Sequence, residues 1–218
     1  MKLLVNKLHY PVEVLGPGRR AGIWVQGCTI HCFGCISRDT WPADPRFGVD
    51  VKDVLGWLSA LPADGVDGIT ISGGEPFDQP DALENLLQGL HEWRAELSSP
   101  VDILAYSGRS YDDLATEFPA QLAKLDAVVS EPFVQGAPTL LPLRGSANQR
   151  VVALSPLGIE RYTGDALDAL GAQRHQMQVA VDNESIWMIG IPEQGALRRI
   201  QAQASSNGLE VGRASWLV

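Results

Sequence analysis

The sequence predicts an α/β fold, in which a parallel sheet carries helices outside it and a smaller α+β module follows. Between residues 22 and 154, short apolar runs alternate with stretches of helical periodicity, which is typical of a parallel sheet. After Pro156 the pattern changes to a hairpin, a helix and a short strand. We therefore expect a main domain over residues 1–155 and a C-terminal module over residues 156–218.

The strands of the main domain are predicted by apolar runs that end in glycine, serine or proline. The first run, from Leu3 to Leu15, reads as a strand or hairpin and ends at Gly16-Pro17-Gly18. Further strands are expected at residues 22–26, 68–72, 101–106, 127–130 and 151–154. Strand 22–26 runs into a loop that holds every cysteine of the chain, and strand 68–72 stops at a pair of glycines.

Helices are expected between these strands. Asp50 can cap a helix whose apolar residues recur at helical spacing, and Leu83 to Leu97 form the clearest apolar face. A further helical stretch, residues 111–125, is broken at Pro119. In the module we expect a hairpin of strands 177–181 and 186–191, a helix at 196–204 and a short strand from Leu209.

Composition and charge exclude several kinds of partner. The apolar fraction of 45% is enough for a real core, while the net charge of -9 repels a phosphate backbone. The basic pairs Arg19-Arg20 and Arg198-Arg199 are short, and we interpret them as solvated surface. The start of the chain lacks the apolar run of a secretory signal, and no window has the length of a membrane span. We expect a cytoplasmic protein that binds neither nucleic acid nor membrane.

The three cysteines, Cys28, Cys32 and Cys35, lie in one loop. An odd, clustered set without an export signal indicates metal or redox chemistry and argues against disulfides. A four-iron cluster usually takes four thiolates, so three would leave one iron open to a ligand. The alternative is a zinc knuckle with His31 as fourth ligand, although His31 adjoins Cys32 and reaching the same metal would strain the loop.

A second motif, Ser72-Gly-Gly-Glu-Pro76, stands where a strand ends and a helix is about to begin. Gly73 and Gly74 leave room for a ligand to approach the backbone, and Glu75 places a carboxylate beside it. Such a carboxylate can accept hydrogen bonds from a ligand ammonium group. Alone this motif is often a simple turn, but here it follows a C-x-x-x-C-x-x-C loop by about forty residues.

Together the two motifs resemble the radical S-adenosylmethionine (SAM) superfamily. Residues 16–41 resemble one branch, the activating proteins of anaerobic ribonucleotide reductase, in order and spacing. Segments 71–76, 106–108, 126–133 and 145–150 follow the same branch, so that the resemblance covers roughly residues 10 to 154. The sequence departs from the branch at Ser130-Glu131, where Asp-Gly is typical, and in the extra module after residue 156.

The resemblance implies a partial (βα) barrel of radical SAM type, with a [4Fe-4S] cluster and SAM as cofactors. By position, Cys28, Cys32 and Cys35 would hold the cluster. The residues that would contact SAM are Gly73, Gly74 and Glu75 for its amino group, Ser107 and Ser130 for its carboxylate or ribose, and then Asn148 and Arg150. His31 is expected either beside the cluster ligands or at the surface, and not as a ligand.

The resemblance also implies an enzyme that cleaves SAM reductively to a 5′-deoxyadenosyl radical, which takes a hydrogen atom from a substrate. The first interpretation is an activase that forms a glycyl radical on a partner enzyme, with flavodoxin or ferredoxin as electron donor. The second is radical modification of a peptide or small molecule, which the extra module favours. A third, an iron–sulfur electron-transfer protein, is disfavoured by Glu75. We expect the module to pack on the main domain and to help select the partner.

Overall fold

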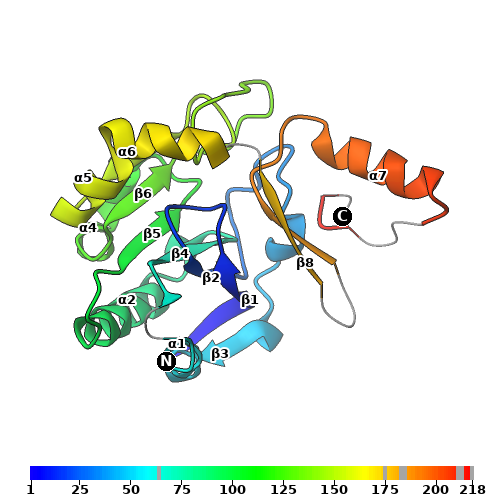
Figure 1. Ribbon diagram of the computed structural model, residues 1–218. Helices are drawn as coiled ribbons and strands as arrows, with labels where there is room; N and C mark the ends of the chain where they lie inside the picture. Colours follow the sequence, from blue (N-terminus) through cyan, green and yellow to red (C-terminus); the bar gives the residue numbers. More distant parts are fainter. Residues whose placement is uncertain (63–64, 174–175, 182–185, 210–213, 217–218) are drawn as a thin grey trace.

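The structure is a computed structural model that describes residues 1–218 except 63–64, 174–175, 182–185, 210–213 and 217–218 (Figure 1). The strands are Lys2–Val12 (β1), Arg20–Val25 (β2), Gly48–Asp50 (β3), Gly68–Gly73 (β4), Asp102–Tyr106 (β5), Ala127–Ser130 (β6), Arg150–Ala153 (β7), Met177–Val181 (β8) and Ile186–Gly190 (β9). The α-helices are Val51–Ser59 (α1), Pro80–Ala95 (α2), Tyr111–Glu117 (α3), Pro119–Leu122 (α4), Pro156–Tyr162 (α5), Gly164–Ala169 (α6) and Ala196–Ser206 (α7). Short 3-10 helices are Arg38–Thr40 (η1), Pro45–Phe47 (η2), Pro76–Asp78 (η4) and Leu170–Gln173 (η5).

The centre of the molecule is a seven-stranded sheet in the order β3-β1-β2-β4-β5-β6-β7, and the mixed α/β class is confirmed. Strands β2, β4, β5 and β6 are parallel, whereas β1 and β7 run antiparallel to their neighbours. A parallel pair needs a crossover of a dozen residues or more, and helices supply it after β4 and β5. Residues 131–149 between β6 and β7 contain no helix, and β7 runs antiparallel to β6. The prediction that strand 151–154 extends a parallel sheet is therefore wrong. The partial barrel remains a prediction.

Most expected elements are confirmed at the predicted places. The stretch 111–125 is interrupted at Pro119, since α3 ends at Glu117 and α4 begins with the proline. Asp50 stands at the N-cap of α1, but its side chain makes no capping hydrogen bond. Leu209 is not part of a strand, and the rest of that expected strand falls largely outside the described residues. Over the described ranges, no helix combines the length and apolarity that crossing a bilayer requires.

Helices cover both faces of the sheet (Figure 1). On one face of the sheet, the apolar side of α2 is buried against the strands. Leu83 and Leu87 of α2 belong to the same buried cluster as Ile103 of β5. The opposite face buries Leu104 together with Tyr162 of α5. Neighbouring residues of β5 thus point to opposite faces, as the period of two requires. The sheet is buried on both sides, which explains its nearly continuous apolar strands.

Arg20 is fully buried, so its interpretation as solvated surface is wrong. Its guanidinium donates to Asp102 at 2.6 and 3.1 Å and to Thr70 Oγ1 at 2.6 Å. Arg161 Nη1 at 2.6 Å and the Tyr162 hydroxyl donate to the same carboxylate. Burial alone would raise the pKa of Asp102, but the charge of Arg20 and these hydrogen bonds hold the pKa below its usual range.

The part of the chain after residue 156 contacts the sheet at two places. Arg161 and Tyr162 of α5 bind Asp102, directly after the expected domain boundary. The β8–β9 hairpin lies against β1, where Gln178 accepts from Glu13 N at 3.1 Å. The Trp187 ring lies 5.9 Å from that of Trp24. In Figure 1 the hairpin and α7 lie on the side of the molecule away from α2. The boundary at residue 156 stays a prediction.

We expect Asp102→Ala to lower the free energy of unfolding by about 3–5 kcal/mol, because Arg20 would stay buried without its counter-charge. Denaturant unfolding followed by circular dichroism measures the change. Arg46→Gln is the matched control, since it breaks an exposed ion pair with Asp44 and should leave the midpoint unchanged. Equal midpoints for both variants would contradict the role given to the buried pair.

Candidate functional site

The cysteine loop begins directly after β2 and turns sharply three times. Positive φ angles occur at Gly27 (97°), His31 (50°) and Gly34 (82°). Such angles suit glycine, and His31 is a residue type that tolerates them better than most. At Gly34 a side chain would also lie 2.9 Å from Gln135 Cδ. All three cysteines of this loop are free, half-buried thiols, and Cys35 N donates to Cys32 O at 3.1 Å.

These thiols fit an iron–sulfur cluster better than a single ion. Burial raises the pKa of both Cys28 and Cys32, so binding to a cation is what would ionise them. Within the described residues, no group of three or more His, Cys, Asp or Glu side chains is arranged around one ion position. A cluster needs no such arrangement, because each thiolate binds a different iron. His31 stacks on Trp41 with ring centroids 4.5 Å apart, which disfavours the zinc alternative.

The Gly-Gly-Glu-Pro turn is joined to the cysteine loop through backbone atoms. Gly74 N donates to Val25 O and Glu75 N donates to Gly27 O, both at 2.8 Å. A Cβ on Gly74 would lie 2.1 Å from Gly27 O, and one on Gly73 would lie 2.7 Å from Val25 O. Both glycines are therefore required for the approach of the two backbones. Their contact with a ligand stays a prediction.

The Glu75 carboxylate is buried, with 1% of the residue exposed, and the structure brings Ser107 to it. Oε1 accepts from Ser107 Oγ at 2.8 Å and from Phe77 N at 3.1 Å, and Oε2 accepts from Gly108 N at 2.8 Å. Burial raises the pKa of Glu75 to about 7, against the opposing effect of these hydrogen bonds. A carboxylate has about four lone-pair sites. One site on Oε2 is thus left for a further donor.

Ser130 is fully buried at the end of β6, and its Oγ has no hydrogen-bond partner in the described structure. A buried, unpaired hydroxyl is destabilising, so a ligand that pairs with it gains affinity. Arg150 lies opposite Ser130 in the β6–β7 ladder, and its guanidinium is 5.2 Å from the Tyr111 ring centroid. Asn148 is exposed and donates to Pro132 O at 2.8 Å. Asn148 and Arg150, which are predicted to contact SAM, therefore already have partners within the chain.

Glu131 stands where the activating-protein branch typically has glycine, and its backbone has a geometry that favours glycine. Its φ is 81°, in the left-handed region that disfavours most side chains. Two contacts hold it in place. Its N–H donates to Arg109 O at 2.8 Å, and its Oε1 accepts from Tyr111 N at 3.1 Å. The turn after β6 thus keeps its shape without the glycine.

Sequence reasoning missed Asp78 and Arg109, which tie three loops together. Asp78 accepts from the N–H of Thr29 at 2.7 Å and from its hydroxyl at 3.0 Å. Arg109 Nη2, from the loop after β5, donates to the same carboxylate at 2.7 Å. The one signal in the sequence was the position of Asp78, three residues after Glu75. Its partners lie 49 and 31 residues away, too far for any local pattern to reveal them.

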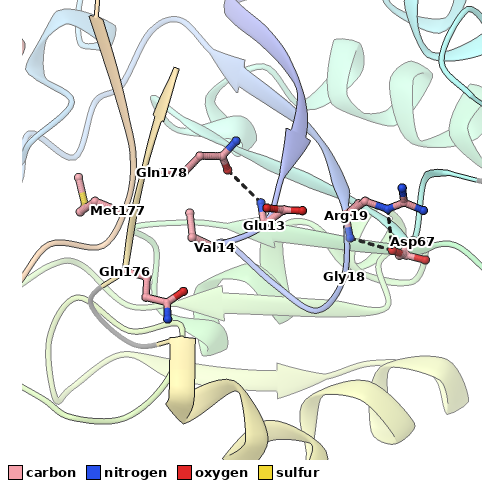
Figure 2. A pocket seen from close by; sticks show the side chains of 8 residues that line it. All are labelled: Glu13, Val14, Gly18, Arg19, Asp67, Gln176, Met177 and Gln178. Atoms are coloured by element: carbon pink, nitrogen blue, oxygen red, sulfur yellow. Dashed lines mark hydrogen bonds and ion pairs between the residues drawn. The ribbon is translucent and has the colours of Figure 1, made fainter. Parts of the chain in front are cut away.

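A separate cavity of about 470 Å³ lies between the hairpin and the main sheet (Figure 2). It is lined by Glu13, Val14, Gly18, Arg19, Asp67, Gln176, Met177 and Gln178. Arg19 and Asp67 precede β2 and β4, whereas the cysteines and Glu75 follow these strands. One strand length, roughly 20 Å, thus separates the cavity from the cysteine loop. Arg19 N donates to Asp67 at 2.8 Å across the cavity wall. The cavity is not part of the candidate site.

Comparison with known proteins gives consistent matches over the main domain. Residues 14–152 match the family of 4Fe-4S single cluster domains. The chain is 31% identical over 147 residues to the anaerobic ribonucleoside-triphosphate reductase-activating protein of Vibrio cholerae, covering 65% of this chain and 92% of that protein. The protein of that name in Escherichia coli K12 is 31% identical over 150 residues, covering 66% and 94%. The pyruvate formate-lyase-activating enzyme of Staphylococcus aureus is 38% identical over 99 residues, covering 41% and 39%.

The pKa of Glu75 predicts a specific dependence of stability on pH in the cluster-free chain. The folded state keeps this proton up to about pH 7, whereas the unfolded state loses it near 4.5. Rising pH therefore favours unfolding, and stability falls by roughly 3 kcal/mol across that interval. Glu75→Gln cannot titrate at this position, so the difference in unfolding free energy between wild type and variant should show this fall. A difference that stays constant from pH 4.5 to 7 would contradict the raised pKa.

Proposed function

The chain belongs to the family of 4Fe-4S single cluster domains and to the radical SAM activating enzymes, and we propose that it forms a glycyl radical on a partner enzyme. As a member of this family it is an enzyme with a [4Fe-4S] cluster and SAM as cofactors. The observation that carries the proposal is the backbone connection between the cysteine loop and the Glu75 turn. It joins the predicted cluster loop to the turn that carries the Glu75 carboxylate, at the carboxyl edge of the sheet.

When bound, the reduced cluster and SAM supply one-electron cleavage of the sulfonium bond, which yields methionine and a 5′-deoxyadenosyl radical. Cys28, Cys32 and Cys35 would hold the cluster through their thiolates, and the iron that has no thiolate would be open to SAM. The chain would thus supply ligands for the cluster and orientation for SAM.

Glu75 binds the amino group of SAM through the free lone pair of Oε2. Ser107 and the Gly108 amide hold this carboxylate in place, so it is fixed before the ligand arrives. Ser130 donates its unpaired hydroxyl to the carboxylate or ribose of SAM. Gly73 and Gly74 keep the backbone close to the cysteine loop. Asn148 and Arg150 complete this edge of the site and would have to leave their present partners to reach the ligand.

The partner is a glycyl-radical enzyme, which the names of the relatives support, since both kinds activate another enzyme. Flavodoxin or ferredoxin would supply the electron, and the reaction would take place in the cytoplasm without nucleic acid. A second candidate is radical modification of a peptide or small molecule. The observation in its favour is the segment after residue 156, which lies beyond the family match at residues 14–152.

The test is to incubate the reconstituted, reduced protein with SAM and a glycyl-radical enzyme from the same organism. We expect the paramagnetic resonance signal of a glycyl radical on that enzyme, because hydrogen abstraction from glycine leaves the unpaired electron there. Cys32→Ala removes one cluster ligand and should abolish the signal.

The matched control for the ligand set is Phe33→Leu, which changes an exposed side chain of the loop without removing a thiol and should leave the iron content unchanged. Iron analysis of wild type should give a four-iron cluster. Stoichiometric zinc after anaerobic reconstitution would contradict the cluster assignment. A normal cluster that cleaves SAM but leaves the partner without a radical would favour the second candidate.

A further inference from the structure

Ser215 is bound to the segment that follows the cysteine loop. Ser215 Oγ donates to Ile36 O at 2.6 Å, and Arg38 N donates to Ser215 O at 3.2 Å. The neighbouring Ala214 is buried, with 8% of the residue exposed. Ser215 therefore binds the segment that directly follows Cys35, although 179 residues separate it from Ile36.

Between these two hydrogen bonds lies a donor to a predicted cluster ligand. Ser37 N donates to Cys35 Sγ, with 3.4 Å between nitrogen and sulfur. Ile36 and Arg38 are the neighbours of Ser37 on either side, and Ser215 holds both of them. Ser215 thus fixes the orientation of the Ser37 amide, because it binds the residue before Ser37 and the residue after it.

The same segment reaches the first cysteine as well. Gly27 N donates to Thr40 O at 2.7 Å, and Cys28 N donates to Trp41 O at 3.0 Å. The Arg38 guanidinium lies 5.2 Å from the Trp41 ring centroid. Residues 36–41 are therefore the segment through which a displacement of Ser215 would reach both Cys35 and Cys28.

We propose that Ser215 is a positioning residue that holds the Ser37 amide against Cys35 Sγ and thereby raises the reduction potential of the cluster. Hydrogen bonds to ligand sulfurs are among the factors that set this potential. An N–H dipole pointing at sulfur stabilises the extra electron of the reduced cluster, so losing its alignment favours the oxidised form. The inference rests on the proposed cluster ligands. Because Ser215 lies outside the family match at residues 14–152, this contact belongs to the extra segment of the chain.

The test is an anaerobic redox titration of the reconstituted full chain, followed by the paramagnetic resonance of the reduced cluster. For Ser215→Ala we expect the reduction equilibrium to shift threefold to tenfold toward the oxidised form, a potential roughly 30–60 mV more negative for one electron. Ser215→Thr keeps the hydroxyl and should restore the wild-type potential. Ser205→Ala, at an exposed serine of α7, is the matched control and should not change it.

Release of iron to a chelator provides a second measurement that does not depend on the titration. It should be roughly threefold to tenfold faster in Ser215→Ala, the effect of one lost hydrogen bond, and unchanged in Ser205→Ala. If Ser215→Ala kept the wild-type potential and the wild-type rate of iron release, the role of Ser215 would be overturned, whatever the thermal stability of the variant. The proposed function would not be affected. Equal shifts in both alanine variants would also overturn it. A wild-type chain that takes up no cluster would overturn the proposed function as well.

Discussion

The contact between Gly74 and Gly27 is the constraint on which the rest of the site depends. Two strand ends meet there without side chains, and a Cβ on Gly74 would lie 2.1 Å from the Gly27 oxygen. The contact fixes the start of the cysteine loop on one side and Glu75 on the other. Asp78, three residues further on, then binds Thr29 within the loop itself. The proposed cluster site and the proposed SAM site are thus parts of one hydrogen-bonded unit.

Features with a local cause could be predicted from the sequence, and features with a distant cause could not. The local sequence contains three cysteines within eight residues and a glycine pair before Glu75, and both motifs indicate a binding site. The spacing of apolar residues likewise predicts the strands and helices. The burial of Arg20 depends on Asp102, 82 residues away, so a basic pair could only be read as surface. The direction of β7 depends on the absence of a helix between residues 131 and 149, which the run of apolar residues does not reveal.

The segment after residue 156 contributes to both ends of the main sheet. At the amino ends of the strands, Arg161 and Tyr162 complete the partners of the buried Asp102 carboxylate. At the carboxyl ends, Ser215 holds the residues that follow Cys35. A segment outside the family match is thus linked both to a buried charge and to the cysteine loop. The extra segment can thus influence the proposed cluster ligands without carrying a ligand itself.

The central claim is that a hydrogen atom passes from a glycine of a partner enzyme to the adenosyl group derived from SAM. The most direct measurement is to label that partner with deuterium at glycine, incubate it with the reduced protein and SAM, and analyse the 5′-deoxyadenosine by mass spectrometry. The account predicts deuterium in 5′-deoxyadenosine, in proportion to the radical formed on the partner. Unlabelled 5′-deoxyadenosine, formed at the same rate with and without the partner, would contradict it.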